Sequence, residues 1–186
     1  MNPTLLTDQS RLQEIYDLRV LAYEHSSKAQ YVNRHLFPDG WTDDLDARDT
    51  TLHWIIEDAG RIIAAARLAI LHTLSDTNEK FDQFELPTER PFAYWSRLVV
   101  HPDYRRTGAT MRLDTVRKTY LTDHPAIRFA VCCLTAERHK AITRLGFQYL
   151  GDFMYTWNGP EQSVSAFVYL NHSLQGAYMK LNTHES

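Results

Sequence analysis

The sequence predicts a mixed α+β domain in which helices pack against one sheet. Short apolar runs alternate with segments of helical periodicity, and this order is typical of a mixed sheet flanked by helices. Two of the apolar runs are joined by Asp58-Ala59-Gly60, a turn sequence that favours an antiparallel hairpin. With 186 residues, of which 44% are hydrophobic, the chain has the length of one domain with one core.

Helical periodicity appears at three places along the chain. The first helix is predicted at Ser10–Tyr23, where the first residue and Gln13 have the spacing of a capping box. The second is predicted at Ala109–Thr122, because its apolar residues share one face. A short third helix is predicted at Glu137–Leu145, closed by Gly146 as a left-handed cap.

Runs rich in β-branched, aromatic and alanine residues predict the strands. They are His53–Glu57, Ile62–Leu71, Phe92–Val100, Ile127–Leu134, Phe147–Trp157 and Ser163–Leu170. The segment Glu24–Asp49 is predicted to be irregular, with one short helix left open, and the polar tail beyond Asn171 is compatible with one more helix. The segment His72–Pro91 is long for a loop inside a compact domain, and such loops often carry function, so we expect it to border a substrate pocket.

Charge and composition limit the expected partners. The formal net charge of −3 arises from 20 basic and 23 acidic residues in a mixed pattern, which disfavours nucleic acid or an anionic membrane as a partner. No apolar run is long enough to cross a bilayer, and the first residues lack the pattern of a secretory signal, so we expect a cytoplasmic protein. The only cysteines, Cys132 and Cys133, are adjacent, which predicts reduced thiols and no metal site.

The segment Arg105–Thr110 is the principal candidate for a binding site. It lies between a predicted strand and a predicted helix, and the first N–H groups of a helix have no partner inside it. The peptide dipoles add roughly half a positive charge there, and Gly108 lets a ligand approach the backbone closely. Arg105 and Arg106 would be disfavoured at that positive end unless an anion lay beside them. We therefore predict a pyrophosphate-binding turn; the alternative is a pair of solvated surface arginines.

A resemblance to a known family begins with the run Leu98-Val99-Val100-His101-Pro102-Asp103-Tyr104-Arg105-Arg106-Thr107-Gly108. This run resembles the acetyl-CoA motif of the GNAT N-acetyltransferase superfamily. The family pattern is Arg or Gln, two residues, Gly, one residue, then Gly or Ala, and Arg105, Gly108 and Thr110 occupy those positions. Thr110 departs from the small residue of the pattern. The segment Ala141–Phe147 is similar to the family's helix that ends in a Gly-Phe pair before a strand.

The resemblance implies a fold, a donor and a set of binding residues. The implied fold is a twisted mixed sheet of about seven strands, flanked by helices and splayed between strands 4 and 5 near Val100. The whole chain would form one acyltransferase domain that uses acetyl-CoA and no metal. The residues assigned to coenzyme A are Leu98, Val99, Val100, Arg105, Arg106, Thr107, Gly108, Ala109 and Thr110. Within this set, the backbone of Leu98–Val100 would hold the thioester carbonyl.

Four short segments are similar to one branch of the superfamily, the autoinducer synthases and N-acyl amino acid synthases. They are Ile15-Tyr16-Asp17-Leu18-Arg19, Asp46-Ala47-Arg48-Asp49, Ala66-Arg67-Leu68 and Ser96-Arg97-Leu98. This similarity leaves, as an alternative donor, a long acyl chain carried by coenzyme A or by an acyl carrier protein.

Acyl transfer to an amine needs a base for the amine and an acid for the departing thiolate. By the resemblance, the carboxylate base falls at Tyr94 and the tyrosine acid at Ile142, so neither expected group is present. A phenol has an ordinary pKa of about 10, and Tyr94 is therefore predicted to order a water in the pocket, unless it is only a packed aromatic. His101 and His139 are alternative bases. We expect direct transfer rather than an acyl-cysteine, because apolar surroundings raise the pKa of a thiol.

Three functions are compatible with the sequence. The first is an acetyl-CoA-dependent N-acetyltransferase acting on the amine of a small molecule or a peptide. The second is an N-acyl amino acid or signal synthase with a long-chain donor. The third is a non-catalytic acyl-CoA-binding regulatory domain, which the missing acid and base would suit. The sequence leaves monomer and homodimer open.

Overall fold

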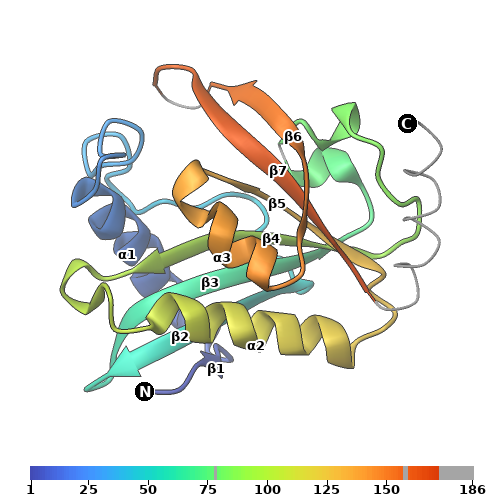
Figure 1. Cartoon of the computed structure of the whole chain (residues 1–186). Helices are drawn as coiled ribbons and strands as arrows, with labels where there is room; N and C mark the ends of the chain where they lie inside the picture. Colours follow the sequence, from blue (N-terminus) through green and yellow to red (C-terminus); the bar gives the residue numbers. More distant parts are fainter. Residues whose placement is uncertain (78, 157–158, 172–186) are drawn as a thin grey trace. The chain divides into compact units, whose positions relative to one another are not determined.

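The computed structural model describes residues 1–77, 79–156 and 159–171 (Figure 1). Its strands are β1 (Thr4–Leu5), β2 (Thr51–Asp58), β3 (Arg61–Leu71), β4 (Phe92–Val100), β5 (Phe129–Leu134), β6 (Gln148–Tyr155) and β7 (Gln162–Leu170). Its α-helices are α1 (Leu12–Glu24), α2 (Ala109–Asp123) and α3 (His139–Arg144). Five 3-10 helices are η1 (Gln9–Arg11), η2 (Leu74–Thr77), η3 (Phe81–Gln83), η4 (Pro102–Tyr104) and η5 (Ala136–Arg138).

The seven strands form one sheet in the order β1-β2-β3-β4-β5-β7-β6. β4 and β5 run parallel and pair where both strands begin, at Ala93 with Ala130 and at Tyr94 with Val131. The pairs β1–β2, β5–β7 and β6–β7 are antiparallel. The predicted mixed sheet of this size, splayed between β4 and β5, is therefore confirmed.

The chain divides into two compact units. Among the described residues, the first contains those of 1–68, 96–117 and 156–161, and the second contains those of 69–95, 118–155 and 162–171. Each unit has its own buried side chains, and each is described separately below.

In the first unit, α1 packs its apolar face against strand residues. The buried cluster consists of Leu6, Leu12, Ile15, Leu18, Ala22, Ile55, Ile62, Ala65 and Val99. The hairpin of β2 and β3 turns at Ala59 and Gly60, whose φ angles of 49° and 78° are both positive. Two positive φ angles are what a two-residue turn between antiparallel strands requires, so the predicted hairpin is confirmed.

The predicted capping box at the start of the first helix is wrong. Ser10 lies inside η1, and Asp8 is the capping residue, accepting hydrogen bonds from the main-chain N–H of Ser10 at 3.0 Å and from its hydroxyl at 2.6 Å. The chain enters α1 through this 3-10 turn, and Arg11 at the α-helical boundary makes no side-chain cap. An aspartate two residues earlier thus replaces the serine as the acceptor.

The segment between α1 and β2 is irregular, as predicted, but the short helix that the sequence allowed is absent from it. It nevertheless packs firmly, because Tyr31, Val32 and Trp41 form a buried cluster with Val20 of α1. The main-chain N–H of Trp41 donates to the carbonyl of Tyr16 at 3.1 Å. This segment is therefore held against α1 by both its backbone and its aromatic side chains.

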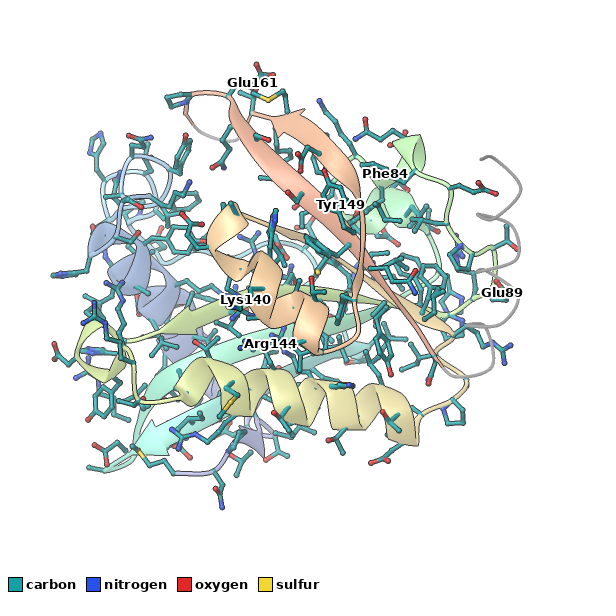
Figure 2. All side chains as sticks on the ribbon, viewed as in Figure 1. Phe84, Glu89, Lys140, Arg144, Tyr149 and Glu161 are labelled. Carbon is teal, nitrogen blue, oxygen red and sulfur yellow. The ribbon has the colours of Figure 1, made fainter. Side chains whose placement is uncertain are left out.

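The second unit has an aromatic core. Phe92 of β4 stacks on Phe129 of β5 with centroids 5.2 Å apart, and Phe147 lies 5.2 Å from Trp95 and 5.4 Å from Tyr169. Gly146, at a φ of 96°, ends the helical segment after α3 as predicted, and its N–H donates to the carbonyl of Thr143 at 2.9 Å. α3 turns Lys140 and Arg144 outward (Figure 2).

The last two predicted strands form an antiparallel hairpin (Figure 1). Its register shifts between Tyr149 and Gly151, which is a β-bulge. A Cβ atom at Gly151 would lie 2.8 Å from the ring of Phe84, so glycine is what allows the segment between β3 and β4 to pack against β6. Trp157, which the sequence places at the end of a strand, its neighbour Asn158, and the predicted tail helix lie outside the described residues.

Candidate functional site

The turn between β4 and α2 is anchored to neighbouring elements of the first unit. The guanidinium of Arg105 donates to the carbonyls of Ala22 at 2.6 Å and His25 at 2.5 Å, where α1 ends. A cation at a helix carboxyl terminus satisfies unpaired carbonyls and the helix dipole. The structure thus places this predicted phosphate ligand on α1, while the side chain of Arg106 is exposed.

The main chain of the same turn is open to a ligand. Among the described residues, the N–H groups of residues 106–110 donate to no main-chain carbonyl, and the first helical bond runs from Arg112 N–H to the carbonyl of Gly108 at 3.1 Å. Arg106 and Gly108 have φ angles of 66° and 82°, and no atom lies within 4 Å of a Cβ built on Gly108. These unpaired donors and the open space above Gly108 fit a phosphate group at the helix amino terminus.

His101 is a structural residue of this turn. Its Nδ1 accepts from the N–H of Asp103 at 3.3 Å, and its Nε2 lies 2.5 Å from the guanidinium of Arg61. Burial and the positive charge of Arg61 lower the pKa of His101, which favours a neutral ring that can accept the Asp103 bond at Nδ1. Both ring nitrogens are therefore engaged, and this candidate base has no nitrogen directed at a substrate.

The strand before the turn presents its side chains alternately. Val99 is buried in the cluster beneath α1, whereas Leu98 and Val100 are half-buried. Arg97 has a positive φ of 55°, an unusual conformation for a non-glycine strand residue. Its guanidinium lies 3.8 Å from the centroid of the Trp41 ring and donates to Asp43 at 2.6 Å. These contacts fix the backbone immediately before the segment assigned to the thioester.

A buried network of charged groups supports this part of β4. We call it the Asp46 network; its members are Arg19, Asp43, Asp46, Arg67 and Arg97. Asp46 accepts two bonds from Arg19, at 2.6 and 2.8 Å, and one from Arg67 at 2.9 Å. Arg67 also donates to Ser96 at 3.0 Å, so the network reaches β4 directly.

Electrostatics explain why the Asp46 network is ionised although it is buried. Burial alone would raise the pKa of Asp46, but the hydrogen bonds and charge of Arg19, followed by the charge of Arg67, hold it well below its usual range. The pKa of Asp43 is lowered in the same way, with Arg67 and Arg97 outweighing its burial. The sequence had assigned four of these five residues to a family branch without predicting that they would meet.

Tyr94 lies in the second unit, at the β4–β5 pairing. Its side chain is 6% exposed, and its hydroxyl donates to the carboxylate of Glu79 at 3.0 Å. Glu79 belongs to no motif, and the only sequence feature that pointed to its segment was the length of the polar stretch between β3 and β4. The structure therefore places a carboxylate beside the position where the resemblance expected one.

The other candidate groups of the second unit are in packed surroundings. Ile142 is fully buried, and the ring of His139 lies edge-on to Phe167 at 5.1 Å. Cys132 and Cys133 are free thiols, as predicted. Burial raises the pKa of Cys133, and the negative charge of Glu79 raises it further, so this thiol stays protonated and is a poor nucleophile.

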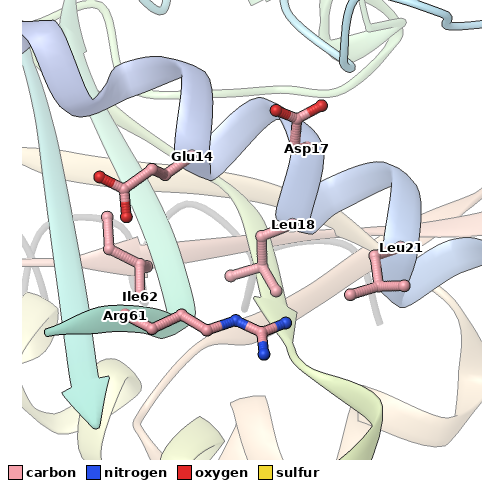
Figure 3. Close-up of a pocket in the computed structure, with 6 residues that line it drawn as sticks. All are labelled: Glu14, Asp17, Leu18, Leu21, Arg61 and Ile62. Atoms are coloured by element: carbon pink, nitrogen blue, oxygen red, sulfur yellow. The ribbon is translucent and has the colours of Figure 1, made fainter. Parts of the chain in front are cut away.

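A pocket of about 220 Å³ lies in the first unit between α1 and the start of β3 (Figure 3). It is lined by Glu14, Asp17, Leu18, Leu21, Arg61 and Ile62. None of the residues predicted for the cofactor or for catalysis lines it. Within the described part of the chain, no group of His, Cys, Asp or Glu side chains is arranged to hold a metal ion, and no helix is long and apolar enough to span a membrane.

Comparison with protein families gives one match. The model of the acetyltransferase (GNAT) family matches residues 12–147, which is well over half of the chain. Among curated protein sequences, none matches significantly.

Several solved structures have a similar fold. An acyl-homoserine lactone synthase, BjaI, solved with SAM and isopentyl-CoA, aligns with a TM-score of 0.68 at 15% identity over 96% of this chain and 85% of its own. An acyl-CoA N-acyltransferase from Pseudomonas aeruginosa aligns with a TM-score of 0.64 at 14% identity over 91% and 99% of the two chains. FeeM, an N-acyl amino acid synthase from uncultured soil microbes, aligns with a TM-score of 0.62 at 10% identity over 90% and 89%. At these identities the similarity establishes a common fold.

Proposed function

Because this chain belongs to the acetyltransferase (GNAT) family, we propose that it transfers an acetyl group from acetyl-CoA to the amine of a small molecule or a peptide. The chain has the fold of that family and is an acyltransferase. The acetyl donor and the amine acceptor are the proposed part. Transfer would be direct, with both substrates bound together, since the protonated Cys133 is unsuited to carry the acyl group.

The observation that carries the proposal is the open main chain at the start of α2. We propose that the N–H groups of residues 106–110 hold the pyrophosphate of coenzyme A, because they are unpaired and lie at the positive end of a helix dipole. The space above Gly108 admits the phosphates without meeting a side chain. The exposed Arg106 adds positive charge, and Arg105 contributes by fixing the turn to α1. The backbone of Leu98–Val100 would then receive the thioester carbonyl.

A longer acyl donor is the second candidate, and one structural observation favours it. Arg19, Asp46, Arg67 and Arg97, which carry the similarity to the signal-synthase branch, belong to one buried network. Two similar structures are an acyl-homoserine lactone synthase and an N-acyl amino acid synthase. Measuring kcat/KM for a series of acyl-CoA donors, with and without an acyl carrier protein, separates the candidates. A maximum at acetyl-CoA supports the first, and a rise with chain length supports the second.

The cofactor site is tested by replacing Gly108 with tryptophan and measuring coenzyme A binding by calorimetry. The bulky side chain would fill the space for the phosphates, and we expect binding to weaken at least about tenfold, equivalent to about 1.4 kcal/mol. Gly60→Trp is the matched control, because Gly60 also has a positive φ, of 78°, and open space around its Cβ position. Both variants carry the same backbone strain, so equal affinity of Gly108→Trp and Gly60→Trp would contradict the assignment.

The reaction itself is tested by the release of free thiol from acetyl-CoA with a panel of primary amines. We expect amine-dependent release by the unmodified chain and little release by Gly108→Trp at the same donor concentration. A chain that binds coenzyme A but releases thiol with no amine, for any donor length, would contradict the proposed transfer.

A further inference from the structure

Arg112 is a cation in the first turn of α2, the helix into which the open turn leads (Figure 1). Its main-chain N–H makes the first helical bond, to the carbonyl of Gly108 at 3.1 Å. The positive end of a helix dipole disfavours a cation at this place, and the first turn of α2 contains no acidic residue that would offset it. An anion beside Arg112 would remove the conflict.

The side chain of Arg112 runs back along the open turn. Helical side chains tilt toward the amino terminus of their helix, so a long one covers the turn that precedes it. The distance of 3.4 Å from Nη2 of Arg112 to the carbonyl oxygen of Thr107 shows this direction. The guanidinium therefore lies beside the turn whose N–H groups at residues 106–110 are the proposed phosphate ligands.

The guanidinium of Arg112 is held only weakly in this position. Within the described part of the chain, its one hydrogen bond is the contact with Thr107, and 3.4 Å is long for an N–H···O bond. Its Nε is shielded from solvent and has no hydrogen-bond partner. A buried N–H without a partner costs free energy, so the side chain loses little when it turns toward a ligand.

Arg105, which the sequence predicts to be a phosphate ligand, is held differently. Its guanidinium makes two short bonds to the carbonyls at the end of α1, at 2.6 and 2.5 Å. To reach a phosphate it would have to leave both carbonyls, whereas Arg112 would give up one long bond. The guanidinium groups available to the turn are therefore those of Arg112 and the exposed Arg106.

The number of phosphates distinguishes the two kinds of acyl donor. Coenzyme A carries a diphosphate and a 3′-phosphate, whereas the phosphopantetheine arm of an acyl carrier protein carries a single phosphodiester. Main-chain N–H groups at a helix amino terminus are a sufficient site for one phosphate. A guanidinium matches further phosphate oxygens with its planar set of donors. Two such groups beside the helix terminus fit the donor that carries a nucleotide.

Resting on the proposed coenzyme A site, we propose that Arg112 is a specificity-determining residue that binds a phosphate group of the coenzyme A nucleotide. The phosphate is one that the carrier-bound arm lacks, either the second phosphate of the diphosphate or the 3′-phosphate. The chain therefore selects acyl groups carried by coenzyme A over the same groups carried by an acyl carrier protein. Arg112 stands two positions after Thr110, outside the family pattern.

Calorimetry on the full chain with three ligands tests this role. The ligands are coenzyme A, dephospho-coenzyme A, which lacks the 3′-phosphate, and 4′-phosphopantetheine, which lacks the nucleotide. Arg112→Gln should weaken coenzyme A binding about 10- to 100-fold, the usual contribution of a hydrogen bond between charged groups, and leave phosphopantetheine binding unchanged. A similar loss for dephospho-coenzyme A assigns Arg112 to the diphosphate, and no loss assigns it to the 3′-phosphate.

Two further variants separate the guanidinium from its charge. Arg112→Lys keeps the charge but not the planar set of donors, so its loss of coenzyme A affinity should be intermediate. Arg34→Gln is the control, because it removes the same charge from an exposed ion pair with Asp17. Coenzyme A affinity of Arg112→Gln equal to that of the control, or equal losses for coenzyme A and for phosphopantetheine, would overturn the proposal.

Steady-state kinetics separate donor binding from a merely structural role. A group that holds the nucleotide equally in the ground state and in the transition state affects KM and leaves kcat unchanged. Arg112→Gln should therefore raise the KM for acetyl-CoA about 10- to 100-fold at constant kcat and constant Tm. A lower kcat at unchanged KM would contradict this role.

The same measurements distinguish this inference from the proposed function. If the unmodified chain binds no coenzyme A, the proposed function itself fails. If the unmodified chain and Arg112→Gln bind coenzyme A equally well, the assignment of Arg112 fails and the coenzyme A site stands.

Discussion

Replacing Asp46 by asparagine would unbalance the Asp46 network. Asp46 has a side chain that is 0% exposed and accepts bonds from Arg19 and Arg67 at 2.6–2.9 Å. Asparagine keeps the shape but removes the charge and turns an amide donor toward a guanidinium. Arg67 would retain Asp43 at 2.5 Å. Arg19, also 0% exposed, would retain an uncharged partner, the carbonyl of Trp41 at 3.0 Å.

The expected loss of stability follows from that burial. Removing one partner of a buried ion pair costs about 3–5 kcal/mol, because a charge is left uncompensated in the interior. For a chain of this length each kcal/mol corresponds to about 2–4 °C in Tm, so we expect Asp46→Asn to lower Tm by roughly 6–20 °C near neutral pH. Circular dichroism during heating measures the change, and urea unfolding measures the free energy directly.

Asp17→Asn is the matched control for this prediction. Asp17 pairs with Arg34 at 2.7 Å, but their side chains are 44% and 47% exposed, and such a surface pair contributes about 0–1 kcal/mol. Because the folded pKa of Asp46 lies below its ordinary 3.8, its contribution is present above that pH and is lost as the pH falls further, so the gap between the parent and Asp46→Asn should narrow in acid. Equal Tm values for the two variants would refute the reasoning.

Two further predictions concern the first unit. Arg105→Gln should lower the free energy of unfolding, measured in urea, by about 1–2 kcal/mol, because Arg105 caps the carbonyls at the end of α1. The side chain of Arg106 is exposed, so Arg106→Gln should change this free energy by less than about 0.5 kcal/mol. Similar losses in the two variants would argue against the cap. Burial lowers the pKa of His53 from 6.5, so only the unfolded chain gains this proton as the pH falls below 6.5, and the parent loses stability there. Urea unfolding at about pH 7.5 and about pH 5.5 measures this loss of stability, which should be smaller in His53→Gln. An equal loss in the parent and in His53→Gln would exclude His53 as its source.

The parts of the fold that were predicted correctly depend on local chemistry. Gly60 can adopt the positive φ of a hairpin turn, and Gly146 can end a helix, whatever surrounds them. Arg105 shows the limit of such reasoning. Beside Gly108 it resembles a phosphate ligand, but its guanidinium binds carbonyls of residues 80 and 83 positions away in the sequence. The role of Arg105 is set by this tertiary contact, and neither the periodicity nor the spacing of the sequence carries a signal for it.

Glu79 was missed for a related reason. A motif relates a role to one position in the sequence, and the residue at that position, Tyr94, is not a carboxylate. The structure brings the carboxylate of Glu79 to 3.0 Å from that phenol, although the two residues are 15 positions apart in the sequence. The contact forms within a packed segment, because Phe81 lies edge-on to the ring of Tyr94 and Phe84 fits beside Gly151 of β6, and neither of these tertiary contacts has a signal in a motif or in the spacing of residues.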